Sequence, residues 1–369
     1  MIQLIAAEVL NAVYRASRVT ESAGENTVGS SFYVIPGNEG PRWILPGTPA
    51  IGKAVISGWR PYGFYSKIKW QILRLAYSLG CLRYVPRVTV ISVDGANLEL
   101  PFIENKVSPV IYVGTPGRQQ KAVVSLVCGQ SNSVVAVLKV PLQLGAKDSI
   151  QREVSALRKL NLAGVQSVPK YIGSDKSQGW SLQSVLKGRV SGGKLRKSHV
   201  DFLLSLRTGL TRSLDSCIQE IDGYAPSSRC GLTDNQSQLV KIAFAAISDS
   251  ADFPEVVFHG DFAPWNIKEN GCELGVVDWE DSDANGFPFW DLCHFFFIQE
   301  FLLGLPDTVS ELINNKLVDY YLGELGIDDL GRKQLLIAYI LFNVCCANHG
   351  VTAEYRIFLI NKMAAVLEL

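Results

Sequence analysis

The sequence is poor in charged residues and has no excess of either sign. Only 19% of its 369 residues are charged, and 35 Lys and Arg balance 35 Asp and Glu, whereas soluble globular chains carry roughly 25% charged residues. No overall charge therefore attracts the chain to nucleic acid or to an anionic membrane, and no nucleic-acid partner is expected. Because 47% of the residues are hydrophobic, disorder throughout the chain is also excluded. Any binding specificity must come from a local site.

Metal-binding and disulfide signatures are also missing. The chain has eight cysteines but no C-x-x-C pair, and it has only four histidines. A zinc site or a disulfide framework is therefore not expected, and this usage is typical of a reducing compartment. The N-terminal sequence MIQLIAAEVLNAVYR has no basic residue before its apolar stretch and includes Glu8, so it does not resemble a secretory signal. These features favour a cytoplasmic protein.

No hydrophobic run has the length and purity of a transmembrane segment, which needs about 20 apolar residues. The run at 335–347 is too short. The run at 289–305 is interrupted by four polar residues: Asp291, His294, Gln299 and Glu300. Both runs are therefore predicted to be core helices, and no membrane-spanning segment is expected.

Changes in hydrophobic periodicity divide the chain into three regions, at 1–98, 99–187 and 188–369. The first region contains two hairpin patterns, at 31–46 and 88–103, in which apolar stretches flank turn residues. In the second hairpin the turn is an Asp-Gly pair, which supplies the positive φ angles of a tight turn.

Between the two hairpins, residues 66–77 have helical periodicity and place Ile68, Ile72 and Leu75 on one face. We expect that face to point into the core, and a membrane-surface helix is the alternative. The whole first region is expected to pack on the strands of the second, because many large aromatic side chains left exposed would form an adhesive patch. These residues are Phe32, Trp43, Trp59, Tyr62, Phe64, Tyr65 and Trp70.

The second region has the pattern of three antiparallel strands followed by a helix. The predicted strands are 110–114, 122–127 and 134–140, and the predicted helix is 148–160. Asp148 and Gln151 have the spacing of a capping box at the start of this helix. Glu153 lies on the apolar face of the helix, so its carboxylate needs a partner.

The third region is mostly helical, with helices predicted at 198–212, at 236–248 and after residue 289. The first of these is supported by an apolar stripe: Phe202, Leu203, Leu206 and Leu210. A non-helical segment at 255–280 interrupts the helices and sets polar residues among apolar ones. Because loops held by a scaffold commonly carry catalytic groups, the chemistry is expected in this segment.

That segment contains His259, Gly260 and Asp261, then Asn266 and, after two apolar residues, Asp278. Phosphoryl transfer from ATP has a loose transition state whose charge is spread over phosphate oxygens, so an enzyme needs cations, positioning and one group oriented on the acceptor hydroxyl. Protein kinases use a His-x-Asp loop with an Asn five residues after the Asp, followed by a metal-binding Asp at a strand end. The same order and spacing occur here.

On these residues, the sequence resembles the aminoglycoside phosphotransferase and choline kinase-like family, small-molecule kinases of the protein-kinase-like fold. The matching motifs are H-G-D-x-x-x-x-N at 259–266, D-W at 278–279 and P-x-x-D-L at 288–292. The resemblance extends over about 107–369. Gly260 stands where protein kinases have the arginine that pairs with a phosphorylated activation loop, so a small-molecule acceptor is favoured.

The resemblance implies an α+β, two-lobed protein-kinase-like fold. The lobe at 99–187 would bind the nucleotide on an antiparallel sheet, and the mainly helical lobe at 188–369 would carry the catalytic loop. Residues 1–98 would form an additional N-terminal α+β region packed on the nucleotide-binding lobe.

Catalytic and metal-binding roles also follow from the resemblance. Asp261 would orient the acceptor hydroxyl and take its proton, and His259 would fix the loop by hydrogen bonding. Asn266 and Asp278 would hold Mg²⁺ that bridges the phosphates of ATP. The nucleotide-binding lobe would supply Gly114, Thr115 and Gly117 of a phosphate-covering loop, Lys139 on a phosphate, Glu153 paired with Lys139, and Gln183 and Val185 beside adenine.

The predicted function is therefore an ATP- and Mg²⁺-dependent phosphotransferase acting on a hydroxyl of a small molecule, such as a sugar, an aminoglycoside, a choline-like compound or a glycan precursor. Two alternatives remain at this point. One is a catalytically weak nucleotide-binding or scaffold protein of the same fold, and the other is a kinase for a protein or a membrane-linked glycan. The acidic run that begins at the D-W motif has two interpretations. It could recognise a cationic acceptor, or it could be a metal-binding Asp followed by a solvated turn. The run consists of Asp278, Glu280, Asp281 and Asp283.

Overall fold

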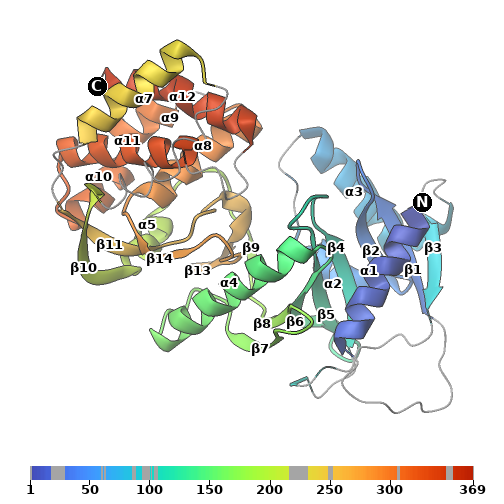
Figure 1. Ribbon diagram of the computed structural model, residues 1–369. Coiled ribbons are helices and arrows are strands. Elements are labelled where there is room, and N and C mark those ends of the chain that lie inside the picture. Colours follow the sequence, from blue (N-terminus) through green and yellow to red (C-terminus); the bar gives the residue numbers. More distant parts are fainter. Residues whose placement is uncertain are drawn as a thin grey trace. The chain divides into compact units, whose positions relative to one another are not determined.

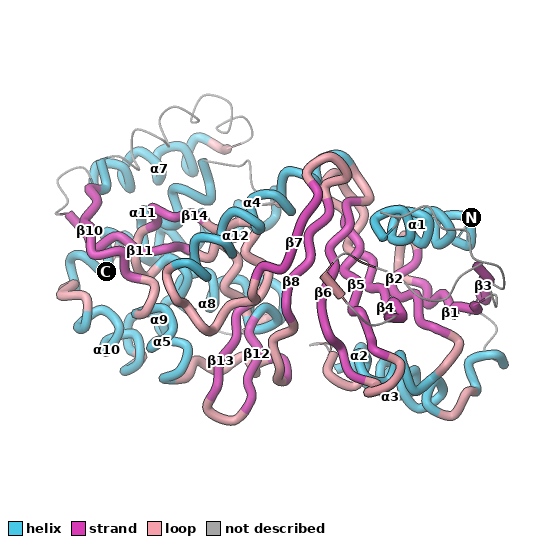
Figure 2. Tube along the Cα trace, turned by 90° about the horizontal axis from the view of Figure 1, so that it is seen from below, coloured by secondary structure: helices cyan, strands magenta, loops and turns pink. Residues whose placement is uncertain are grey.

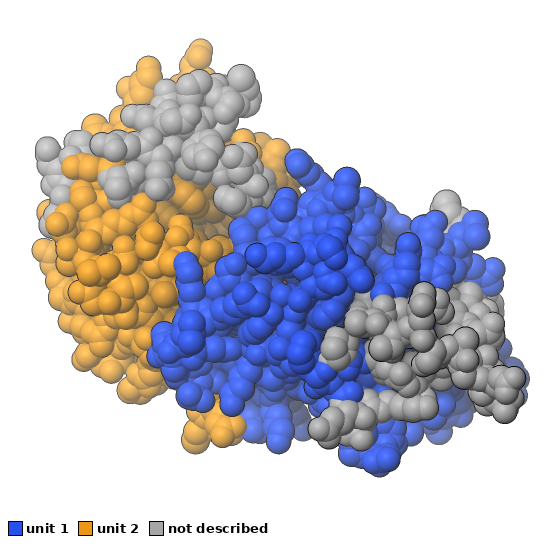
Figure 3. Space-filling model, turned by 60° about the horizontal axis from the view of Figure 1, so that its bottom comes forward, with its two compact units in different colours: residues 1–190, 268–270 blue, residues 191–267, 271–369 orange. Residues whose placement is uncertain are grey.

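The computed structural model describes residues 2–17, 30–59, 61, 64–84, 89–93, 100, 102–103, 107–215, 232–247, 252–305, 308–345 and 352–368. The chain forms two compact units (Figure 3). Unit 1 comprises Met1–Val190 and Lys268–Asn270, and unit 2 comprises Ser191–Ile267 and Gly271–Leu369. Among the described residues, no helix is both long enough and apolar enough to cross a membrane.

Unit 1 is built on an eight-stranded antiparallel sheet in the order β3-β1-β2-β4-β5-β6-β8-β7 (Figure 1). Its strands are β1 (Ser30–Pro36), β2 (Pro41–Pro46), β3 (Thr89–Val93), β4 (Val107–Val113), β5 (Lys121–Cys128), β6 (Ser133–Pro141), β7 (Tyr171–Asp175) and β8 (Trp180–Ser184). Two short strands, β9 (Arg189–Val190) and β12 (Ile267–Asn270), pair with each other. The predicted three-strand meander is confirmed as β4, β5 and β6.

The strands of the N-terminal region extend the same sheet. The first predicted hairpin is confirmed as β1 and β2. Of the second predicted hairpin, the structure describes the first strand as β3, which pairs with β1. Leu100, Phe102 and Ile103 are not in a strand. The Asp-Gly turn at 94–95 lies outside the described residues.

Helices cover both faces of this sheet (Figure 2). Phe32, Val34 and Ile44 pack against α1 (Ile2–Ser17) on one face. Trp43 and Leu45 pack against α2 (Pro49–Ile56) and α3 (Phe64–Ser78) on the other, with η1 (Cys81–Tyr84) following α3. Successive residues of β2 thus enter opposite cores, as the alternation of side chains along a strand requires.

Helix α3 presents the face opposite to the predicted one. The residues expected to face the core are exposed, at 45% for Ile68, 63% for Ile72 and 63% for Leu75. Trp70 and Tyr77 are buried instead. The Trp70 indole N–H donates to the Trp59 carbonyl at 3.0 Å and the Tyr77 hydroxyl to the Pro46 carbonyl at 2.7 Å. Trp70 and Tyr77 therefore set the orientation of α3, because each buries a large aromatic surface and its polar atom has a hydrogen-bond partner.

Helix α4 (Leu144–Leu162) begins earlier than predicted. Asp148 is exposed inside the helix, and the N-cap position belongs to Gln143, so the predicted capping box is wrong. The Leu142 and Gln143 N–H groups both donate to the Gln120 carbonyl, which holds the chain as it leaves β6. The helix therefore starts directly after the strand, and it contacts β6, β7 and β8.

Unit 2 is mainly helical and contains a small sheet in the order β10-β11-β14. Its elements are α5 (Lys197–Leu204), β10 (Arg207–Ser213), α7 (Asp234–Ile247), β11 (Asp252–Phe258), η2 (Pro264–Asn266), β13 (Glu273–Val276), β14 (Asp283–Gly286), α8 (Trp290–Leu303), α9 (Thr308–Asn314), α10 (Lys316–Glu324), α11 (Asp329–Cys345) and α12 (Ala353–Leu367). The two apolar runs at 289–305 and 335–347 form α8 and α11, which pack together, and residues 346 and 347 lie outside the described residues.

The helix predicted at 198–212 is too long. Helix α5 ends at Leu204, and the chain continues as β10, which pairs with β11. Gly209 has a φ of +81°, which a helix does not accommodate. Leu210, counted in the predicted stripe, is 64% exposed on the strand.

Candidate functional site

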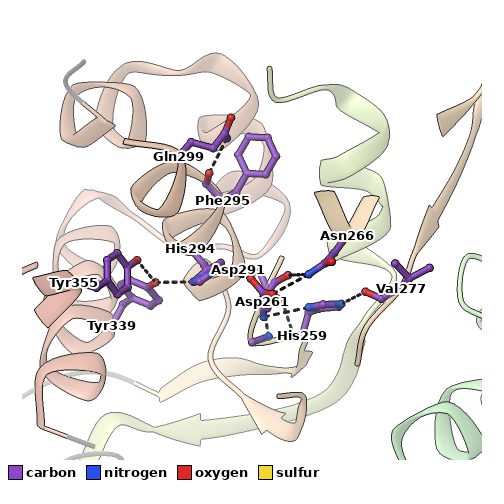
Figure 4. A network of polar contacts seen from close by, with 11 residues as sticks. His259, Asp261, Asn266, Val277, Asp291, His294, Phe295, Gln299, Tyr339 and Tyr355 are labelled. Atoms are coloured by element: carbon purple, nitrogen blue, oxygen red, sulfur yellow. Dashed lines mark hydrogen bonds and ion pairs between the residues drawn. The ribbon is translucent and has the colours of Figure 1, made fainter. Parts of the chain in front are cut away.

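His259 follows β11 and is fully buried at the centre of a hydrogen-bonded loop (Figure 4). Its ring Nδ1 accepts from the Asp261 N–H at 3.2 Å, and its Nε2 lies 3.1 Å from the Val277 carbonyl oxygen. An imidazole that accepts at Nδ1 and donates at Nε2 is neutral, with its proton on Nε2. The ring thus connects the loop to the residue before Asp278.

Burial lowers the pKa of His259 from 6.5 to about 4, although the negative charges of Asp261 and Asp278 act in the opposite direction. The ring is therefore neutral at neutral pH. It holds the loop by hydrogen bonds, and its titration lies far from the pH at which a general base works best.

This shift gives a pH prediction for stability. Between pH 6.5 and about 4 the unfolded chain binds a proton at His259 that the folded chain excludes, so acidification costs up to about 3 kcal/mol from this group. Asp291 has the opposite effect on stability: burial raises its pKa from 3.8 to about 7, so acidification over this range stabilises the folded chain at this group.

The comparison of wild type with His259→Gln isolates the contribution of the histidine. The free energy of unfolding, measured by urea denaturation, should fall less steeply in the variant over this pH range, and parallel curves would contradict the assignment.

Gly260 adopts a left-handed φ of +86°. A Cβ at this position would lie 2.2 Å from the carbonyl oxygen of Asp281. Any side chain would therefore clash with backbone as well as strain the turn. The close approach explains why glycine stands between His259 and Asp261.

Asp291, in the first turn of α8, anchors the loop. Its two carboxylate oxygens accept the backbone N–H groups of His259 and Gly260 at 2.9 and 3.1 Å. The side chain is 5% exposed. The helix that begins at the P-x-x-D-L motif thus fixes the backbone on which Asp261 stands.

The carboxylate of Asp261 is held from two sides. Asn266 Nδ2 donates to Oδ2 at 2.8 Å, and His294 Nε2 lies 2.9 Å from Oδ1. The side chain of Asp261 is 34% exposed, so a substrate can reach it. Two fixed donors and an open side make a carboxylate that is oriented and accessible, which general-base chemistry needs.

Asn266 and Asp278 supply oxygen atoms of the kind that Mg²⁺ prefers. Asn266 is 7% exposed, and its Nδ2 also donates to the Asp261 carbonyl at 2.9 Å, so its amide oxygen is the atom that would be directed at an ion. The Val277 N–H donates to the Asn266 carbonyl at 2.9 Å, and Asp278 follows with a left-handed φ of 71°. No group of three or more His, Cys, Asp or Glu side chains in the described part of the chain is arranged for a metal. The donor set fits an ion whose remaining ligands are phosphate oxygens and water.

Sequence reasoning did not assign a role to His294. Its Nδ1 lies 3.2 Å from the Tyr339 hydroxyl, which lies 3.3 Å from the Tyr355 hydroxyl. Burial raises the pKa of Tyr339, so both hydroxyls stay protonated. A chain of hydrogen bonds thus leads from the core of unit 2 to Asp261. The one signal in the sequence is the spacing, since His294 lies one helical turn after Asp291.

In unit 1, Lys139 on β6 and Glu153 on α4 form a buried ion pair. Lys139 Nζ lies 2.8 Å from one carboxylate oxygen of Glu153 and 2.7 Å from the other. The two side chains are 5% and 1% exposed. The Glu153 carboxylate, which lies on the apolar face of its helix and was predicted to need a partner, is thus paired with Lys139.

Two further polar residues lie on the sheet face of Lys139. The register of β6 and β8 pairs Lys139 with Ser181 and Val137 with Gln183. Both Ser181 and Gln183 are buried, and neither Ser181 Oγ nor Gln183 Oε1 has a hydrogen-bond partner among the described residues. Buried polar atoms without a partner are costly unless a ligand or water satisfies them. The half-buried Val185 follows at the end of β8.

The predicted phosphate-covering loop is a turn between β4 and β5. The Gly114 N–H donates to the Lys121 carbonyl at 2.9 Å, so it is not available for a phosphate. A Cβ on Gly114 would lie 3.0 Å from the same oxygen, which accounts for the glycine. Thr115 and Gly117 lie exposed in the turn.

Comparison with known proteins gives a family match and a fold. Residues 128–302, which contain the Lys139–Glu153 ion pair and the loop of His259 and Asp261, match the model of the phosphotransferase enzyme family, APH. The structure is similar to a thermostable mutant of aminoglycoside phosphotransferase APH(4)-Ia in a ternary complex with AMP-PNP and hygromycin B, with a TM-score of 0.51 and 13% identity over 71% of this chain and 94% of that chain. The predicted resemblance and the α+β, protein-kinase-like fold are therefore confirmed.

Two other structures are similar at lower scores. A putative fructosamine-3-kinase from Thermobifida fusca YX-ER1 has a TM-score of 0.49 and 17% identity over 72% of this chain and 95% of that chain. Choline kinase LicA from Streptococcus pneumoniae has a TM-score of 0.46 and 17% identity over 69% of this chain and 91% of that chain. No curated protein matches the sequence.

Proposed function

We propose that this protein is an ATP- and Mg²⁺-dependent phosphotransferase that moves the γ-phosphate to a hydroxyl group of a small molecule. The observation that carries the proposal is the carboxylate of Asp261, which is oriented by Asn266 and His294 and remains 34% exposed. The family match over residues 128–302 supports the same class of reaction.

In this proposal Asp261 accepts a hydrogen bond from the acceptor hydroxyl, orients its oxygen toward the γ-phosphorus and takes its proton late in the transfer. The His294 N–H keeps the carboxylate in place during this step. Asn266 and Asp278 hold the metal ion, which neutralises charge on the phosphate oxygens when bound.

The residues of unit 1 would bind the nucleotide. Lys139 places a positive charge for the phosphates, and Glu153 holds its ammonium group in one position through two short contacts. Ser181 and Gln183 offer buried polar atoms to a nucleotide on the same sheet face. Thr115, Gly117 and Val185 would contact the nucleotide at the edges of this face, whereas Gly114 shapes the turn.

The function is tested by measuring Mg²⁺-dependent ATP consumption with a panel of sugars, aminoglycosides, choline-like alcohols and glycan precursors. We expect at least one hydroxyl compound to raise ATP consumption above the rate without an acceptor, and its analogue lacking the hydroxyl to have no effect. MgATP binding without acceptor-stimulated turnover across the panel would favour the alternative of a nucleotide-binding scaffold.

A further inference from the structure

Helix α3 presents an apolar stripe to solvent. The stripe consists of Tyr65 at 77% exposure, Ile68 at 45%, Ile72 at 63%, Leu75 at 63% and, in the turn after the helix, Leu79 at 67%. Spacings of three and four residues place these side chains along one side of a helix. Single exposed apolar residues are common on protein surfaces, whereas a row of five along one side of a helix is a candidate interaction site.

The core of unit 1 does not use this stripe. Trp70 and Tyr77 fix the opposite side of α3 against the sheet through the hydrogen bonds to the Trp59 and Pro46 carbonyls. Leu73 packs in the same cluster. The orientation of the helix is therefore set by contacts that leave the row from Tyr65 to Leu79 outward.

The segment of sequence that contains α3 carries charge of one sign. Residues 40–93 contain eight Lys and Arg and no Asp or Glu, although the whole chain has 35 of each class. With about 3.6 residues per turn, Lys67 and Arg74 lie along one side of the stripe and Lys69 along the other. Arg83 is exposed in η1, just beyond the helix.

We propose that α3 docks on an anionic membrane surface. The apolar row would enter the boundary between headgroups and acyl chains, and the flanking cations would lie at the level of the lipid phosphates. An amphipathic helix with Lys and Arg beside its apolar face binds membranes both by burying apolar area and by electrostatic attraction to anionic lipids.

A second copy of the chain is a less suitable occupant. A row with three- and four-residue spacing also suits helix pairing. Two copies of α3 packed along this row would, however, bring Lys67, Lys69 and Arg74 of each helix together, and residues 40–93 hold no carboxylate to neutralise them. An anionic surface supplies the missing charge.

The proposal concerns a surface of unit 1 and does not depend on phosphoryl transfer, so its test uses no nucleotide. Flotation of the full-length protein is measured with vesicles of phosphatidylglycerol mixed with phosphatidylcholine and with phosphatidylcholine alone. We expect binding to the anionic vesicles and at least about tenfold weaker binding after Ile72→Glu with Leu75→Glu, because carboxylates on the stripe oppose both burial and charge attraction.

A matched control carries the same change elsewhere. Leu162 and Leu330 are 89% and 64% exposed on other helices, so Leu162→Glu with Leu330→Glu adds two carboxylates at the expense of two exposed leucines. The control should bind as wild type does. Equal loss of binding in the control and in the stripe variant would overturn the proposal.

A second variant tests the charge without altering the stripe. Lys67→Gln with Lys69→Gln should weaken binding to anionic vesicles several-fold, and added salt should weaken wild-type binding in the same direction. Sedimentation of the free proteins tests the other occupant. The proposal would be overturned if neither protein bound vesicles and the wild type were a dimer that became a monomer in the Ile72→Glu, Leu75→Glu variant. The stripe would then be a dimer interface.

Discussion

Asp261→Asn is expected to lower the rate of phosphoryl transfer by at least about 100-fold and to leave MgATP binding nearly unchanged. Both oxygens of the carboxylate face nitrogen donors, one on Asn266 and one on His294. An amide has only one oxygen, so its NH₂ group would face a donor and the side chain would turn away. It also cannot take the proton of the acceptor hydroxyl. The loss should therefore fall on kcat.

The measurement compares kcat from steady-state kinetics with MgATP affinity from calorimetry. Asp252→Asn is the matched control, because Asp252 is exposed at the start of β11, the strand that leads to the loop. The control should retain wild-type values of both quantities. A kcat for Asp261→Asn close to that of wild type would remove Asp261 from the catalytic role.

Asp278→Asn should weaken Mg²⁺-dependent nucleotide binding by about tenfold or more, because removing one carboxylate removes one of the charges that hold the ion. Asn is the better replacement than Ala here. Asp278 has a φ of 71°, and Asn adopts this left-handed region more readily than most residues. The substitution thus changes charge with little change in backbone strain.

Calorimetric titration with ATP, with and without Mg²⁺, separates the metal from the nucleotide. We expect the metal-dependent gain in affinity to shrink in Asp278→Asn, whereas ATP binding without metal stays as in wild type. Asp283→Asn, an exposed position in the same acidic run, serves as the control. An unchanged gain in Asp278→Asn would exclude Asp278 as a metal ligand.

The sequence predicted the elements of the fold better than their boundaries. Strands β4 to β6 are short apolar runs rich in β-branched residues and separated by turn residues. The need of Glu153 for a partner follows from its place on an apolar helical face, and the family resemblance named Lys139 as that partner. The end of α5 could not be predicted, because pairing of β10 with β11 is a long-range contact that overrides the helical pattern. The start of α4 depends likewise on hydrogen bonds to Gln120, far from the helix in sequence.

The orientation of α3 shows a different limit. Periodicity counts apolar residues, and by that count Ile68, Ile72 and Leu75 form the stronger face. The structure buries Trp70 and Tyr77, whose area is larger and whose polar atoms meet carbonyl groups of neighbouring segments. Those partners are set by tertiary structure, so local pattern alone selects the wrong face.

For the site, the motif identified the loop but not all of its supports. His259, Asp261 and Asn266 are close in sequence, and their spacing predicted that they act together. His294 reaches Asp261 from a helix that begins 29 residues later, and its hydroxyl partner belongs to a third element. Such contacts become visible only once α8 and α11 are packed.

The most direct test of the account is the fate of the γ-phosphate of radiolabelled ATP, measured with Mg²⁺ and a responding hydroxyl acceptor. The account predicts that wild-type protein transfers the label to the acceptor and that Asp261→Asn, which still binds MgATP, transfers almost none. Equal transfer by the two proteins, or release of the label only as free phosphate by both, would contradict it.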